Sequence, residues 1–184
     1  MTRLSRLAAV VFGTMMLALS ALVAVETIVR KALGISIGGV DELSGYAIAI
    51  GAPLAFTVAL IEQSHIRINL LHMHMSERLQ AVLNLLAALL LAALATYLFA
   101  FTVRTVQETR LYGSLAQTPW ATPLIYPQLL WLVAMGVFAL TSVVLAVRAA
   151  LSALRLDWKG LQRDFGPETV EEELEAELSD LEAR

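Results

Sequence analysis

Hydrophobic residues fall into four long runs along the chain, separated by short polar or charged segments. We place these runs at residues 7–29, 43–61, 79–103 and 124–147. At about 1.5 Å per helical residue, even the shortest run covers about 29 Å, close to the hydrocarbon thickness of a bilayer. The pattern predicts an all-α integral membrane protein with four transmembrane helices, in which residues 1–156 form one membrane domain.

The first run is expected to stay in the protein as a transmembrane helix. A secretory signal also places basic residues before an apolar run, but its apolar region is shorter and ends at a small-x-small cleavage site. Here the run is longer and ends in ALVAVE, which fits that cleavage pattern poorly. A cleaved signal remains the alternative.

The second run combines a central proline with a stripe of small residues. Pro53 lies at mid-span, where its missing N–H predicts a kink rather than a break. In lipid, a smooth stripe lets another helix backbone come close and gain dispersion contacts, which predicts a subunit interface. The stripe consists of Gly45, Ala49, Ala52, Ala55 and Ala59. Alternatively, the stripe does not form an interface and only reflects how common Ala and Gly are in transmembrane helices.

Charged residues mark the ends of the first two runs. Glu26 and Arg30, spaced i and i+4, end the first run, and Asp41 with Glu42 opens the second. The helix dipole and free N–H groups favour carboxylates at a helix start. We predict that the guanidinium of Arg30 meets Asp41 or Glu42 and sets the angle between the helices, with Glu26 as the competing partner. A solvated Glu26–Arg30 pair is the alternative.

Composition and charge narrow the class of protein further. The chain is 58% hydrophobic with a mean hydropathy of +0.72, as in integral membrane proteins. It has no cysteine, which excludes disulfides, thiol nucleophiles and thiolate metal sites. Residues 1–156 carry 10 Lys/Arg and 6 Asp/Glu, a balance of +4, whereas residues 157–184 carry 3 and 10, a balance of −7. We therefore expect residues 157–184 to form a separate, partly helical acidic tail.

Orientation follows from the distribution of basic residues between the loops. With the N-terminus inside, eight basic residues lie on the inner side and four on the outer side, so the positive-inside rule predicts that both termini are cytoplasmic. The inner residues are Arg3, Arg6, Arg67, Arg78, Arg148, Arg155, Lys159 and Arg163, and the outer ones are Arg30, Lys31, Arg104 and Arg110.

Candidate chemistry is sparse along the chain. His65, His72 and His74 lack the i, i+3 or i, i+4 spacing of helical metal ligands, so we interpret them as solvated interfacial residues. Asn84 is a candidate for a hydrogen bond between helices. No ionisable side chain lies near the middle of a run, where ion or proton paths usually need one. We expect no catalytic, cofactor or metal site, no enzyme activity and no nucleic-acid partner, and interpret the chain as an accessory membrane subunit.

Several short motifs resemble one family. Arg30 ends the first run, DEL with Asp41 and Glu42 opens the second, a polar-HI-x-I-N segment with His65 and Asn69 follows, and TPW with Trp120 precedes P-Q before the last run. Together with four spans, these features resemble the small, DctQ-like membrane subunit of tripartite ATP-independent periplasmic (TRAP) transporters.

The resemblance implies partners and a role for the chain. It implies a larger membrane subunit that carries the substrate and sodium sites and moves as an elevator, and a periplasmic solute-binding protein that delivers the solute, often an organic acid. The small subunit would be a fixed scaffold in the bacterial inner membrane, in contact with membrane lipids and with the larger subunit. The alternative from the residues alone is a free-standing four-helix membrane protein that acts in interaction or assembly.

Overall fold

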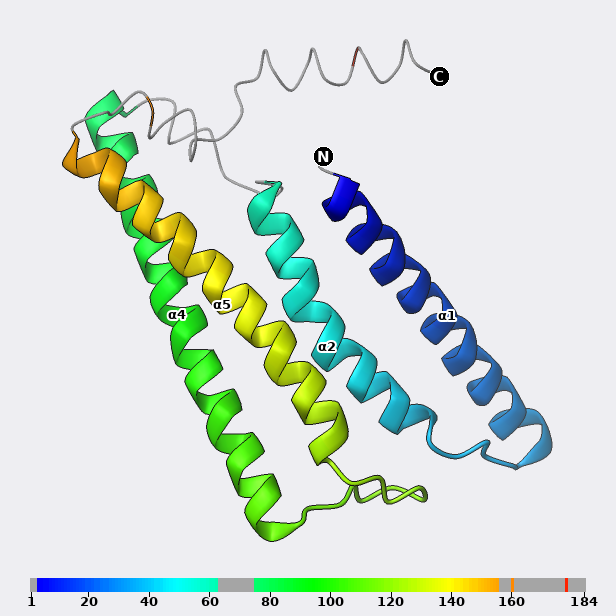
Figure 1. The fold of residues 1–184 in the computed structure, drawn as a ribbon. Helices are drawn as coiled ribbons and strands as arrows, with labels where there is room; N and C mark the ends of the chain where they lie inside the picture. The colour runs from blue at the N-terminus through cyan, green and yellow to red at the C-terminus, as the bar shows by residue number, and fades with distance from the viewer. Residues whose placement is uncertain (1–2, 63–74, 156–159, 161–177, 179–184) are drawn as a thin grey trace. The chain divides into compact units, whose positions relative to one another are not determined.

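The computed structural model describes residues 3–62, 75–155, 160 and 178. Within these residues, the named elements are four α-helices: α1 (Arg3–Leu33), α2 (Val40–Ile61), α4 (Glu77–Tyr112) and α5 (Ile125–Leu154) (Figure 1). All four are long and apolar enough to cross a membrane. The predicted all-α membrane fold is thus confirmed for the described residues. The tail expected at residues 157–184 lies almost wholly outside them.

The helices divide between two compact units. The first unit comprises Met1–Ser64 and Leu91–Val144, and the second comprises His65–Leu90 and Leu145–Arg184. Helices α4 and α5 therefore contribute residues to both units, and α1 and α2 belong to the first. Each unit is described separately below.

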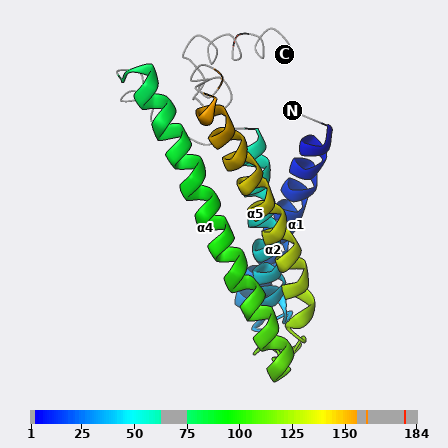
Figure 2. The same cartoon turned by 60° about the vertical axis from the view of Figure 1, so that its left-hand side comes forward.

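In the first unit, α1 and α2 run antiparallel and side by side (Figures 1 and 2). They approach closely at Gly51, where an added Cβ would lie 2.6 Å from Cε2 of Phe12 and 3.1 Å from Cε of Met15. Helix α2 continues unbroken through the buried Pro53, so the proline does not break the helix. The hydroxyl of Thr57 donates to the Pro53 carbonyl at 2.8 Å. The absence of a side chain at Gly51 thus permits a close approach of α1 to α2.

The core of the first unit joins α2 to α4 and α5. Its buried members are Ala95, Phe138 and Ala139, and the partly buried Leu60, Leu91 and Phe99 pack against them. The rings of Phe56 and Phe138 lie 6.0 Å apart, a tilted arrangement typical of aromatic pairs. Side chains from three helices therefore share one apolar cluster.

Buried hydroxyls in this unit bond to their own helices. Thr102 donates to the carbonyl of Leu98 at 3.0 Å, and Ser142 donates to that of Phe138 at 2.8 Å. Both hydroxyls lie in residues that are no more than 2% exposed. A hydroxyl bonded to the carbonyl four residues earlier needs no partner on another helix, so these polar residues can lie inside an apolar core.

The second unit is smaller, and two buried alanines form its apolar core. Ala81 of α4 and Ala149 of α5 are both fully buried, and Leu85 and Ala88 pack against them. The side-chain nitrogen of Asn84 is buried in this part of α4 without a hydrogen-bond partner among the described residues. The interhelical hydrogen bond predicted for Asn84 is therefore not made within the described residues.

Helix α4 is longer than the hydrophobic run that predicted it. It continues past Val103 to Tyr112, and its 36 residues correspond to about 54 Å, well beyond a hydrocarbon layer of about 30 Å. Gly113, with φ of 60°, ends it, and the amide of Ser114 donates to the carbonyl of Thr109 at 3.3 Å. This is a Schellman cap. Hydropathy marks the end of the apolar layer, whereas backbone capping marks the end of the helix.

The close approach at Gly51 yields a testable prediction. Gly51→Ala should lower the free energy of unfolding by about 1–3 kcal/mol, because the new methyl group overlaps the Phe12 ring. Unfolding followed by circular dichroism in mixed detergent micelles measures this change. Gly45→Ala is the matched control, since nothing lies within 4 Å of a Cβ there. It should be neutral or stabilising by up to about 1 kcal/mol. Equal stability of the two variants would contradict the proposed packing.

Candidate functional site

Two carboxylates are buried among the described residues, and both lie where helices meet loops. Glu26 is 3% exposed and lies near the end of α1, and Glu42 is 5% exposed and lies in the first turn of α2. A buried charge is costly unless hydrogen-bond donors or an opposite charge surround it. The groups that meet these two carboxylates therefore define the candidate site.

Glu26 holds the loop between α1 and α2. Its Oε1 accepts hydrogen bonds from Arg30 Nη2 at 2.7 Å, from Arg30 Nε at 3.1 Å and from Ser36 Oγ at 2.6 Å. Its Oε2 accepts a hydrogen bond from the backbone N–H of Ile37 at 2.8 Å. One carboxylate thus joins the end of α1 to a loop eleven residues further along the chain.

The predicted partner of Arg30 was wrong. The guanidinium pairs with Glu26 on its own helix, and among the described residues no ion pair joins it to Asp41 or Glu42. The alternative of a fully solvated pair is also wrong for Glu26, because only the Arg30 side chain, at 56%, is exposed. The loop folds back over Glu26 and supplies the donors that bury it.

Glu42 is bound by hydroxyl groups. Tyr46 donates to its Oε1 at 2.7 Å from one turn further along α2, and Thr118 donates to its Oε2 from the loop between α4 and α5. Thr122 of the same loop also approaches this carboxylate through its side chain and backbone. Capping alone therefore does not account for Glu42. It connects α2 to a loop 76 residues further along the chain.

The loop between α4 and α5 is folded into a narrow hairpin. The amide of Ala116 donates to Thr122 O at 2.9 Å, and that of Leu124 donates to Ser114 O at 3.1 Å. At the tip, the amide of Ala121 donates to Thr118 O at 3.0 Å, closing a turn with Pro119 as its second residue. Proline is favoured there because its ring fixes the required φ. The turn brings Thr118 and Trp120 to the start of α2.

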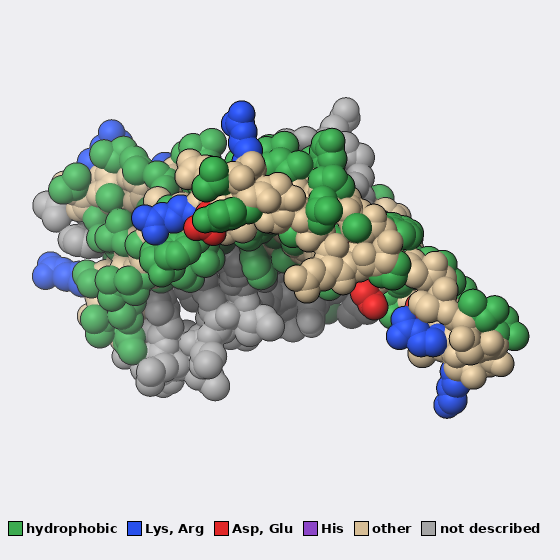
Figure 3. Space-filling view, turned by 90° about the horizontal axis from the view of Figure 1, so that it is seen from below, with side chains coloured by type: hydrophobic (Ala, Val, Ile, Leu, Met, Phe, Trp, Pro, Cys, Tyr) green, Lys and Arg blue, Asp and Glu red, His purple; other side chains and the backbone are tan. Residues whose placement is uncertain are grey.

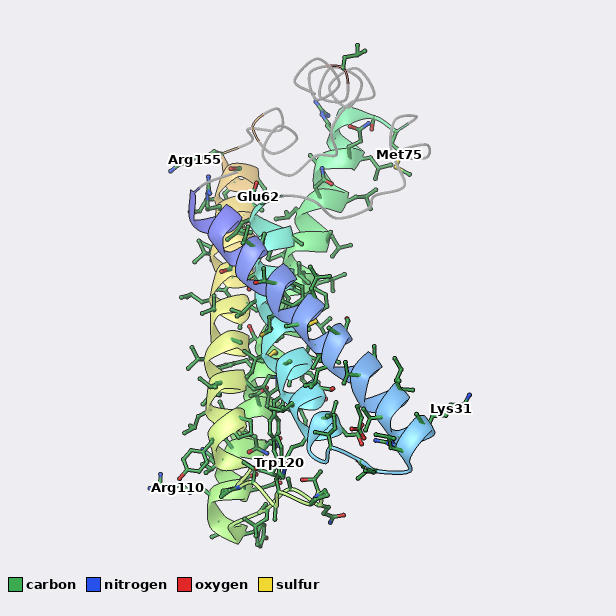
Figure 4. All side chains as sticks on the ribbon, turned by 90° about the vertical axis from the view of Figure 1, so that its right-hand side faces the viewer. Lys31, Glu62, Met75, Arg110, Trp120 and Arg155 are labelled. Atoms are coloured by element: carbon green, nitrogen blue, oxygen red, sulfur yellow. The ribbon has the colours of Figure 1, made fainter. Side chains whose placement is uncertain are left out.

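Trp120 lies directly against Gly39. A Cβ at Gly39 would overlap the indole ring, and Gly39 also has a φ of 73°, a conformation that favours glycine. The ring remains 53% exposed on its other side. Figure 4 labels Trp120 near the first turn of α2, with Glu62 at the opposite end of that helix. The hairpin therefore contacts α2 twice, through Glu42 and through Gly39.

Other predicted site residues have separate positions. Asp41 is exposed. In the predicted stripe of α2, Gly45 is exposed, and the four alanines are half-buried: Ala49, Ala52, Ala55 and Ala59. His65, His72, His74 and Asn69 lie outside the described residues. Within the described part of the chain, no group of three or more His, Asp or Glu side chains could hold a metal ion.

The donors to Glu26 and Glu42 were not predicted from the sequence. Thr118 and Thr122 flank Trp120 in the TPWATP segment, and Ser36 lies in a glycine-containing loop. Threonines beside prolines in a loop are candidates to bind a carboxylate, but nothing in their spacing indicates which one. Only folding brings these hydroxyls to Glu26 and Glu42.

Exposed aromatic side chains occur at this end of the first unit. Tyr112 is 77% exposed, Tyr126 is 67% exposed and Trp120 is 53% exposed, whereas Trp131 is half-buried. Amphipathic rings are enriched at membrane–water interfaces, where one part of the ring lies in an apolar layer and the other in water. Both carboxylate clusters therefore lie at the ends of membrane-spanning helices and outside the mid-membrane region.

The described residues form a four-helix membrane protein whose buried carboxylates fix connecting loops. A family model for the DctQ component of tripartite ATP-independent periplasmic transporters matches residues 19–152. The chain belongs to this family. No curated protein matches the chain.

The contacts of Glu42 predict the behaviour of the hairpin. In Glu42→Gln, amide hydrogen exchange at Ala116 and Leu124 should become about two- to tenfold faster, as expected when one hydrogen bond is lost. The Glu42 carboxylate offers two oxygen acceptors to the hydroxyl donors, whereas a glutamine side chain offers only one. Exchange would be measured by mass spectrometry on the purified chain.

Asp41→Asn is the matched control, because it neutralises the neighbouring carboxylate, which is exposed. Exchange in the hairpin should stay at the wild-type rate in this variant. Wild-type exchange rates in Glu42→Gln would show that the hairpin does not depend on this carboxylate.

Proposed function

We propose that this chain is the small membrane subunit of a TRAP transporter and acts as a stationary scaffold for the large membrane subunit. The observation that carries this proposal is the family match across residues 19–152, which includes all of α2 and α4, about half of α1 and most of α5. The proposal places the chain in the bacterial inner membrane. There it takes part in uptake of a solute, with an organic acid and sodium coupling expected from the family.

The use of the buried carboxylates supports a structural role. Glu26 and Glu42 accept hydrogen bonds from loop atoms, and these contacts fix the geometry of the helix ends. A group that already receives several hydrogen bonds from its own chain is suited to holding a conformation. Fixed helix ends are what a scaffold would need if a second subunit moves against it.

The partners of this scaffold would be proteins and lipids. In the proposed complex, the large membrane subunit carries the transport site, and a periplasmic solute-binding protein delivers the solute. The interface proposed for the large subunit is the small-residue stripe of α2, whose Gly45 end is open. The four alanines of the stripe, half-buried within this chain, could be covered further by a neighbouring helix.

The second candidate is a free-standing four-helix membrane protein that acts in interaction or assembly. Coexpression with a candidate large membrane subunit separates the two candidates. If the chain is the small subunit, an affinity tag on it should recover the large protein in mild detergent. Reconstituted solute uptake should also require both chains. Uptake by the large protein alone would overturn the scaffold proposal.

The interface proposal predicts the effect of a wedge in the stripe. Ala52→Leu should hold the partner helix away, and a loss of about 1 kcal/mol would lower the association constant about fivefold. Recovery of the large subunit would be normalised to the amount of inserted small subunit. Leu54→Ala is the control, since it removes bulk from an exposed position of the same helix. Equal recovery from Ala52→Leu and wild type would move the interface to another helix.

The proposed orientation is tested with reporter fusions. A reporter joined after Arg184 or near His72 should be active as a cytoplasmic fusion, and one near Gly113 as a periplasmic fusion. The reason is the excess of basic residues on the inner side. The comparison uses alkaline phosphatase and a fluorescent protein at each position. The opposite labelling would contradict the proposed orientation. It would also mean that the hairpin between α4 and α5 does not lie in the periplasm.

A further inference from the structure

The connection between α1 and α2 exposes large aliphatic side chains. Leu33 is 67% exposed, Ile35 is 60% exposed and Ile37 is 50% exposed. We refer to these three residues as the aliphatic loop. Loops that face water usually carry polar residues, and contiguous exposed apolar side chains mark interaction surfaces. The aliphatic loop therefore needs a partner.

The conformation of this loop is fixed by its polar groups. Ser36 Oγ and the backbone N–H of Ile37 both donate to the buried Glu26, and Ser36 Oγ also accepts a hydrogen bond from Gly38 N at 3.2 Å. At the end of α1, Gly34 adopts a φ of 67° and donates to Arg30 O at 3.1 Å, which caps the helix. The loop's polar groups face Glu26, and its aliphatic side chains remain exposed.

Basic groups lie directly before the aliphatic loop. Arg30 and Lys31 form the basic last turn of α1, and both are exposed. Arg30 uses Nε and Nη2 for Glu26, so the rest of its guanidinium is directed elsewhere. Figure 4 shows Lys31 extending from the loop end of α1. From this end, Figure 3 shows blue basic side chains among green hydrophobic ones.

We propose that the aliphatic loop is a membrane anchor that binds phospholipids at this end of α1. Leu33, Ile35 and Ile37 enter the boundary between headgroups and acyl chains, and Lys31 and Arg30 bind lipid phosphate. Both basic side chains carry N–H donors for phosphate oxygens, and aliphatic side chains gain from leaving water. Glu26 is the positioning residue, because it turns the loop's polar groups inward.

The location of the loop favours lipid over a protein partner as its occupant. The membrane-spanning part of α1 ends at Leu33, so the aliphatic side chains continue the apolar surface of a helix whose hydrophobic segment is almost wholly unburied within this chain. Phosphate groups of a bilayer lie at this same boundary, where long basic side chains reach them from helix ends. This anchor does not depend on the proposed scaffold role.

The chain has no cysteine, so single-cysteine labelling tests the anchor directly. Ile35→Cys carries a spin label, and the full chain is extracted with its native lipids and partners in polymer nanodiscs. Power saturation with oxygen and a water-soluble nickel chelate then gives the depth of the label. We expect a depth of about 5–10 Å below the phosphates. Asp41→Cys, an exposed polar position at the start of α2, is the control and should lie at or above the phosphates.

Two results would overturn the anchor. A label at Ile35 that is more accessible to nickel than to oxygen would place the loop in water. A label protected from both reagents would show that protein covers it.

A second pair of variants tests the roles of Glu26 and Lys31. In the Ile35→Cys background, Glu26→Gln should decrease the label depth and increase its mobility. Lys31→Gln should decrease the depth with mobility unchanged, because it removes a phosphate contact and leaves the loop's hydrogen bonds intact. Unchanged depth in both variants would remove Glu26 and Lys31 from the anchor. The label depth in the Ile35→Cys chain is measured first. It therefore tests the anchor even if the Glu26→Gln variant does not insert into the membrane.

Discussion

The need of a buried carboxylate for hydrogen-bond donors organises the loop end of the first unit. Glu26 and Glu42 are nearly inaccessible to solvent, and each would be costly to bury without donors. Their donors come from loops: Ser36 and Ile37 for Glu26, and Thr118 for Glu42. Each loop is therefore fixed relative to a helix by the charge that it covers. The hairpin tip, the indole of Trp120 and the aliphatic loop all depend on these contacts.

The same end of the first unit combines two kinds of surface. Trp120, Tyr112 and Tyr126 expose amphipathic rings, and the aliphatic loop exposes side chains without a polar atom. Rings with a polar group suit the interface itself, and aliphatic side chains suit the layer beneath it. The scaffold role proposed above would require a defined depth and tilt in the bilayer, and anchors of both kinds would provide them. The hydrogen bonds of Glu26 and Glu42 connect these anchors to α1 and α2.

Local sequence patterns predicted some interactions and misplaced others. Arg30 was expected to meet Asp41 or Glu42, because the three residues lie at neighbouring helix ends. The spacing of Glu26 and Arg30 within one helix already allowed a short contact, and the loop then buried it. The close approach of α1 to Gly51 was not among the predicted contacts, although a helical wheel had identified other small residues on α2. A helical wheel shows which residues share a face of a helix, but it does not show which face packs against a neighbouring helix.

The four apolar runs, and with them the helices and the membrane class, follow from local sequence, because hydropathy and helix length are local properties. Short motifs around Asp41, Glu42 and Trp120 were also sufficient for the family. That Thr118 donates to Glu42 and that Trp120 covers Gly39 could be seen only in the folded protein. These partners are far apart in the chain, and a hydroxyl or an indole can serve many acceptors and surfaces. Their pairing is fixed by how α2 and the hairpin pack, which no local pattern encodes.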